Sequence, residues 1–131
     1  MRTEVNISDK GKTIYTYDDN DLEIHVGEYN LNGQLLEETI SCYDSKNRST
    51  GWISYNSSGD ILRQVKLIYS TTPNHESEII EYGANMKLIR RTEFIFDDNC
   101  RPIKELHYNN KNKNTGYANI IYGSSGRNIF L

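Results

Sequence analysis

The sequence of 131 residues contains little alanine and little proline, and this bears first on its secondary structure. Two alanines (Ala84 and Ala118) and two prolines (Pro73 and Pro102) stand against ten tyrosines, fifteen asparagines and nine glycines. Alanine is the best helix former, tyrosine favours strands, and asparagine and glycine favour turns. The composition therefore argues against a helix bundle and favours an all-β chain.

Motifs that carry catalytic or metal chemistry are missing as well. Cys42 and Cys100 lie fifty-eight positions apart, and no CxxC motif or histidine at metal-ligand spacing occurs. The sequence has no P-loop, dinucleotide fingerprint, HExxH motif or nucleophile elbow. A catalytic triad assembled in space is recognised only by geometry. From the motifs alone, we expect no enzyme activity, no cofactor and no metal.

The chain has neither an excess of basic residues nor a long apolar run. Fifteen Lys and Arg against eighteen Asp and Glu give a formal net charge of −3. Nucleic-acid-binding domains usually carry a basic excess, and a membrane-spanning helix needs about 20 apolar residues. Residues 1–6 contain no apolar signal-peptide core. We expect a cytoplasmic protein that binds neither nucleic acid nor a membrane.

Aromatic residues recur along most of the sequence at nearly constant spacing. The separations are 12, 14, 12, 14, 13, 14, 12 and 14 positions, for Tyr17, Tyr29, Tyr43, Tyr55, Tyr69, Tyr82, Phe96, Tyr108 and Tyr122. Most of these residues are followed at once by Asn or Asp, and many have Gly or Asn at the fourth place. That pattern is typical of a tight turn with a left-handed residue near its end.

The segments between these turns are rich in β-branched and aromatic residues. They predict about eleven strands, at residues 2–7, 12–17, 22–29, 34–43, 48–55, 60–69, 76–82, 87–96, 101–108, 113–122 and 127–131. Short turns between such strands make an antiparallel meander. We therefore expect one all-β domain over residues 1–131, built from repeats of 12 and 14 residues. Because such a sheet must bury one face or close, we expect it to be curled or barrel-like.

The repeats resemble the YD repeats of the Rhs family, whose signature is Tyr-Asp-x-x-Gly-Arg/Asn-Leu/Ile. The best matches begin at Tyr29, Tyr43 and Tyr122, although Asn47 takes the place of the glycine in the second of them. The copy that begins at Phe96 also lacks the glycine, and only three copies keep Gly in the fourth place after Tyr. Members of the family usually form long β shells around secreted toxin cargo, and this chain has too few strands for such a shell. For a small stand-alone chain, the resemblance implies a binding or immunity role.

Alternate turns of a meander lie at opposite ends of the sheet. One end would carry the turns at 18–21, 44–47, 70–75, 97–100 and 123–126, where Lys46 is the one Lys or Arg. The acidic residues at this end are Asp18, Asp19, Asp21, Asp44, Asp97 and Asp98. Either aspartate is present as a good turn former, or these residues form an acidic rim that attracts a basic partner. Calcium is a third option, but the spacing differs from that of an EF-hand loop.

Trp52 is the only tryptophan, and it is either a packed core residue or a binding anchor. It ends the tetrapeptide 49–52 (Ser-Thr-Gly-Trp), which recurs at 114–117 as Asn-Thr-Gly-Tyr. The segment 70–75 breaks the repeat, either because it carries a function or because Pro73 slackens the turn.

These observations lead to one expected function and one alternative. We expect a protein-binding module, specifically an immunity protein that binds and neutralises a polymorphic bacterial toxin, with a basic cognate toxin as its partner. The alternative is a structural or carbohydrate-binding surface repeat domain that uses Trp52 and Tyr117. The sequence leaves open a monomer or a homodimer paired at the sheet edges.

Overall fold

The computed structural model describes residues 1–69, 76–99, 101–122 and 128–130, and these are almost entirely β-strand. The elements are β1 (Arg2–Ser8), β2 (Gly11–Tyr17), β3 (Glu23–Asn30), β4 (Leu35–Tyr43), β5 (Ser49–Asn56), β6 (Ile61–Tyr69), β7 (Glu76–Tyr82), a short 3₁₀ turn (Ala84–Met86), β8 (Leu88–Phe96), β9 (Pro102–Tyr108), β10 (Asn114–Tyr122) and β11 (Asn128–Phe130). The expected all-β class is confirmed. Each expected strand differs from the observed one by at most one residue at either end.

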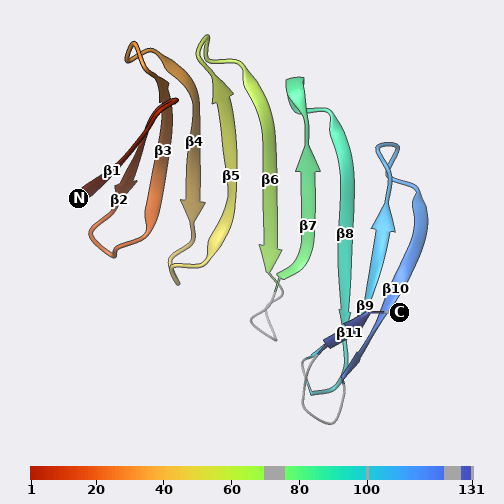
Figure 1. Cartoon of the computed structure of the whole chain (residues 1–131). Coiled ribbons are helices and arrows are strands. Elements are labelled where there is room, and N and C mark those ends of the chain that lie inside the picture. Colours follow the sequence, from red (N-terminus) through yellow and green to blue (C-terminus); the bar gives the residue numbers. More distant parts are fainter. Residues whose placement is uncertain (70–75, 100, 123–127, 131) are drawn as a thin grey trace. The chain divides into compact units, whose positions relative to one another are not determined.

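Strands that follow one another in the sequence are neighbours in the sheet, in the order β1 to β11 (Figure 1). The pairs from β1 to β5 and from β7 to β11 are antiparallel, which confirms the meander. Curling or closure of the sheet concerns its overall shape and stays a prediction. The expected loop at 70–75, the turn at 123–126 and Cys100 lie outside the described residues.

The chain divides into two compact units. Unit 1 comprises Met1–Val65 and Gly83–Met86, and unit 2 comprises Lys66–Tyr82 and Lys87–Leu131. By sequence, unit 1 has eleven Asp and Glu against six Lys and Arg, a formal charge of −5. Unit 2 has seven acidic and nine basic residues, a formal charge of +2. The moderate net charge of the whole chain therefore conceals an acidic unit and a weakly basic one.

Six turns share one hydrogen-bond pattern that explains the sequence repeat. In the turn after β3, Oδ1 of Asn30 accepts the backbone N–H groups of Asn32 and Gln34 at 2.9 and 3.0 Å. The same two bonds are made by Asp18, Asp44, Asn56, Asp97 and Asn109. The fourth turn residue has a positive φ at Asp21, Gly33, Asn47, Gly59 and Asn112. The expected left-handed residue is thus confirmed at these five turns, where Gly, Asn and Asp tolerate that conformation.

The recurring tetrapeptides mark two β-bulges. Between β4 and β5, Ser49 and Gly51 pair with consecutive residues of the neighbouring strand, so Thr50 is the extra residue. Between β9 and β10, Thr115 is extra in the same way. Gly51 (φ 125°) and Gly116 (φ 155°) follow these extra residues in a conformation that favours glycine.

Very few side chains are buried in the described part of the chain. The one buried apolar side chain there is Ile120, at 6% exposure, and the one buried polar side chain is Ser54, at 1%. Large apolar side chains such as Ile7 and Leu31 are exposed instead. Most strand residues in the described ranges are instead partly exposed, so the sheet has no fully enclosed core there. No helix in the described residues is long and apolar enough to cross a membrane.

Candidate functional site

Three of the six predicted acidic residues are engaged within their own turns. The Oδ1 atoms of Asp18, Asp44 and Asp97 each accept two backbone N–H groups, as described above. The remaining oxygen of Asp44 also accepts Nε of Arg48 at 2.8 Å, and that of Asp97 accepts Nε of Arg101 at 3.2 Å. These contacts favour the turn-forming interpretation for the three residues.

The ionisation of two of these carboxyls reflects the same contacts. Burial raises the pKa of Asp44, but hydrogen bonds from the backbone and side chain of Arg48 outweigh it and hold that pKa below its usual value. The pKa of Asp97 is lowered mainly by the backbone N–H of Arg101, with the Arg101 side chain adding to the effect. Both side chains are therefore charged acceptors that stabilise their turns.

The other three predicted aspartates are more exposed. Asp19, with a side chain 92% exposed, accepts a hydrogen bond from the Met1 amino group at 2.8 Å, and Asp21 pairs with Arg2. Asp98 is exposed in the turn after β8. Four of the six residues belong to unit 1, and Asp97 and Asp98 belong to unit 2. A role for them in binding stays a prediction.

Trp52 lies in β5 of unit 1 and is not a core residue, since 37% of it is exposed. It pairs with Ser41 across the sheet, on the same face as the hydrogen-bonded hydroxyls of Thr39 and Ser54, 2.9 Å apart. Tyr117, its counterpart in the tetrapeptide repeat, is 61% exposed in unit 2. The partial exposure of the two rings is compatible with binding, but they belong to different units.

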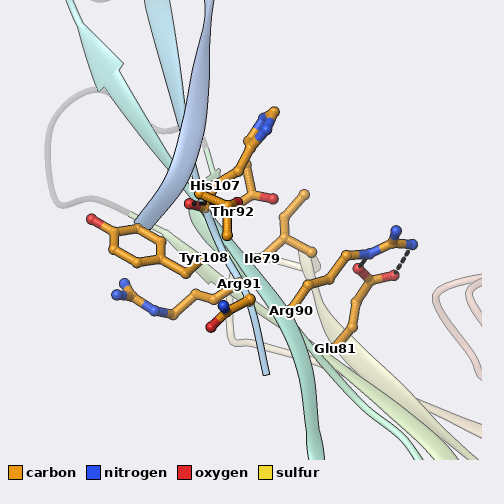
Figure 2. A pocket seen from close by; sticks show the side chains of 9 residues that line it. Ile79, Glu81, Arg90, Arg91, Thr92, His107 and Tyr108 are labelled. Carbon is orange, nitrogen blue, oxygen red and sulfur yellow. Dashed lines mark hydrogen bonds and ion pairs between the residues drawn. The ribbon is translucent and has the colours of Figure 1, made fainter. Parts of the chain in front are cut away.

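A groove in unit 2 has a volume of about 560 Å³ (Figure 2). Its walls include Ile79, Thr92 and His107, which lie directly opposite one another on β7, β8 and β9. The Glu81–Arg90 pair lies one step along the same face. Thr115 lines the groove at the bulge of β10. The groove therefore spans four strands and is lined by polar and charged side chains together with Ile79.

The charged residues of this groove are paired within the protein. Arg90 binds Glu81 through Nε and through Nη2, the latter at 3.1 Å, and these contacts raise the pKa of Arg90 (Figure 2). Nε2 of His107 lies 3.1 Å from a carboxylate oxygen of Glu105. These contacts hold the polar side chains in place, so the described residues that line the groove include no charged group without an ionic partner.

Arg91 also lines the groove, but its guanidinium belongs to the opposite face. It contacts Glu78 and Glu93, which are directly opposite each other on β7 and β8, and lies 3.9 Å from the ring centroid of Tyr108. Its Nε donates to Asn112 in the next turn at 2.9 Å. Burial lowers the pKa of Arg91, but the hydrogen bonds that its guanidinium donates to Glu93 and Glu78 outweigh this effect and raise the pKa above its usual value. Arg91 therefore separates two like charges that would otherwise repel.

None of the predicted site residues lines this groove, so the sequence analysis missed it. The one signal that pointed to it was the repeated Thr-Gly pair, since Thr115 and Gly116 form the bulge at its edge. As for metals, the described residues contain no group of three or more His, Cys, Asp or Glu placed to hold an ion.

Comparisons with known proteins identify no family for this chain. No family model matches the chain, and no curated protein matches it. Among solved structures, it is similar to a porin-like protein from Bacteroides uniformis ATCC 8492, at 11% identity and a TM-score of 0.40. The match covers 93% of this chain and 50% of that one, so the chain spans half the length of the solved structure. A likeness at this level carries no argument about fold or function.

Proposed function

We propose that this chain is a protein-binding module, specifically a cytoplasmic immunity protein that binds and neutralises a polymorphic bacterial toxin without catalysis. The observation that supports binding is the exposure of large apolar side chains among the described residues, where scarcely any side chain is fully buried. Contiguous apolar surface of this kind marks interaction sites in folded proteins. The toxin as partner rests on the resemblance of the repeats to the Rhs family.

The best candidate for the contact surface in unit 1 is an apolar patch formed by Val5, Ile7 and Leu31. Their exposures are 51%, 82% and 72%, and Ile7 and Leu31 line the same small hollow of about 160 Å³. Val5 lies on the same face as Ile7, two positions away on β1. The formal charge of −5 on unit 1 favours a basic partner, because complementary charge accelerates association.

The test is affinity capture of the tagged chain from its native host at low and at moderate salt, read by mass spectrometry. We expect one stoichiometric basic protein whose recovery falls as salt rises. Expression of that protein alone should arrest bacterial growth, and co-expression with this chain should restore it. Absence of a partner at both salt concentrations, or a partner whose expression is harmless, would overturn the immunity proposal.

A pair of substitutions tests the patch itself. Ile7→Ser with Leu31→Ser should weaken the captured complex by at least about tenfold, because apolar anchors dominate interface energies. The matched control is Ile89→Ser, since Ile89 is 51% exposed but lies in unit 2. If the control weakens the complex as much as the pair does, the contact surface is elsewhere.

A further inference from the structure

The groove of unit 2 offers an incoming ligand no unpaired charge, although charged side chains surround it. Arg90 is held by Glu81 through two hydrogen bonds, and His107 lies beside Glu105. The guanidinium of Arg91 is held by two glutamates on the other face of the sheet. An ionic ligand would have to compete with these pairs, whereas a neutral ligand would leave them intact.

Several hydrogen-bonding groups in the groove remain available. Among the described residues, the Thr92 hydroxyl has no partner, and Asn109 uses only its carbonyl oxygen, for the N–H groups of its own turn. The Thr115 hydroxyl donates to the carbonyl oxygen of His107 at 3.4 Å and keeps its acceptor capacity. Nη1 of Arg90 is also uncommitted in the described part of the chain. The groove thus mixes donors with acceptors, a combination that hydroxyl groups match because each does both.

The shape of the groove suits a small molecule. Gly116 lies directly opposite His107, and apart from its chain neighbours no described atom lies within 4 Å of the place where a Cβ of Gly116 would be. The bulge therefore leaves open space on β10 across from His107, while Ile79 provides an apolar wall of the groove. The volume of about 560 Å³ lies in the usual range for small-molecule sites.

We infer that this groove binds a short neutral saccharide. Closely spaced hydroxyl groups would satisfy Thr92, Asn109 and Thr115 together without disturbing the surrounding ion pairs, and the carbon face of a sugar ring would lie against Ile79. This site shares no residue with the apolar patch of unit 1. The inference is therefore independent of the protein-binding proposal.

The experiment is a ¹H–¹⁵N NMR titration of the full chain with maltotriose, cellotriose and triacetylchitotriose in turn. We expect at least one of them to shift the backbone signals of Thr92, His107, Asn109 and Thr115, and to leave those of unit 1 in place. Thr92→Val removes one hydroxyl without changing the shape of the side chain and should weaken binding about fivefold. Thr92→Ser restores the hydroxyl and should restore affinity.

The matched control is Thr13→Val, which makes the same change in β2 of unit 1 and should leave saccharide affinity unchanged. Absence of shifts with all three saccharides at about 20 mM, which excludes even weak binding, would overturn the inference. So would equal affinity of the wild type and Thr92→Val. Shifts produced at the same residues by a neutral Ser-Thr peptide, but by none of the saccharides, would assign the groove to a protein segment instead.

Discussion

The hydroxyl of Tyr43 donates a hydrogen bond to the backbone carbonyl oxygen of Glu23, 2.7 Å away and twenty positions earlier in the sequence. The bond joins the end of β4 to the start of β3. Tyr122 and Pro102 form the same contact at 2.6 Å, again twenty positions apart, between β10 and β9. The tyrosine that ends a long strand thus closes the open end of a hairpin in each unit.

Removal of that hydroxyl should destabilise the hairpin. Tyr43→Phe is expected to lower the free energy of unfolding by about 1 kcal/mol, because it leaves a carbonyl oxygen without its partner. The measurement is urea denaturation followed by circular dichroism. Tyr55→Phe is the matched control, since the Tyr55 hydroxyl has no partner among the described residues. Equal losses in the two variants would show that the hydrogen bond is not responsible.

Arg91 should be more important for stability than its neighbour Arg90. Arg91→Met leaves Glu78 directly opposite Glu93 and should lower the free energy of unfolding by about 2 kcal/mol. Arg90→Met removes a pair whose arginine side chain is 66% exposed, so we expect a much smaller effect. Glu93→Gln added to Arg91→Met should recover part of the loss. No recovery in a urea titration would contradict the role of Arg91 in separating like charges.

The turn at Gly59 tests the physical basis of the repeat. Gly59 has a φ of 85° with open space around the position of a Cβ, so a substitution there meets conformational strain rather than a clash. Gly59→Val should cost about 1–2 kcal/mol, whereas Gly59→Asn should cost much less, because asparagine occupies the same place at Asn47 and Asn112. Ser58→Val, one position earlier at an ordinary φ, is the control. The measurement is the free energy of unfolding of the three variants. A loss for Gly59→Asn or Ser58→Val as large as that for Gly59→Val would contradict the role of the positive φ.

Acid should weaken the two arginine-paired turns. The pKa values of Asp44 and Asp97 are lowered in the folded protein, so their contribution is fully present above the unfolded value of about 3.9. This contribution to stability is lost as the pH falls from the unfolded pKa through the lower pKa values of the two carboxyls in the folded protein. We expect Asp44→Asn with Asp97→Asn to reduce the drop in urea midpoint between pH 5 and about pH 3. Asp98→Asn is the control, and an unchanged drop in the double variant would contradict the expectation.

The exposed aspartates offer a separate test of the acidic rim. Asp19→Asn with Asp98→Asn should slow association with the captured partner and flatten its salt dependence, because charge steering acts mainly through the association rate. The measurement is surface plasmon resonance at two salt concentrations. Asn20→Ser serves as the control, since it changes the turn next to Asp19 without removing a charge. Unchanged association rates would leave these residues without a role in steering.

Much of the fold was predictable because its signals are local. The Asx residue that begins each turn and the Gly, Asn or Asp at its fourth place determine where a strand ends, as at Asn30 and Gly33. This explains why the strand boundaries could be placed to within one residue. The near absence of fully buried side chains in the described residues was not foreseen, because chain length limits how much surface can be buried but does not show how much is buried.

The candidate site was less predictable because it depends on register between strands. The meeting of Thr92 with His107 across β8 and β9 depends on the bulge at Ile103, which shifts the pairing by one residue. The carboxylates of Asp44 and Asp97 are occupied by hydrogen bonds within their own turns, which leaves fewer carboxylates available to a partner. The sequence alone does not distinguish an occupied carboxylate from a free one. The repeated Thr-Gly pair was visible, but its meaning as a bulge required the pairing of β10 with β9.

Each of the shared turns is complete within five consecutive residues, from the Asx acceptor to the second N–H that it accepts. The sequence repeats every 26 or 27 residues, which is the length of one two-strand hairpin with its turns. Duplication or loss of one such repeat in the gene would therefore leave each of the shared turns in the remaining hairpins intact. Such a sheet can grow by the addition of whole hairpins. Each addition provides new surface without changes to the hairpins that are already present. Relatives of this chain are expected to differ in length by multiples of this 26- or 27-residue repeat. Their sequences are expected to vary more at the side chains on the strand faces than at the turn residues.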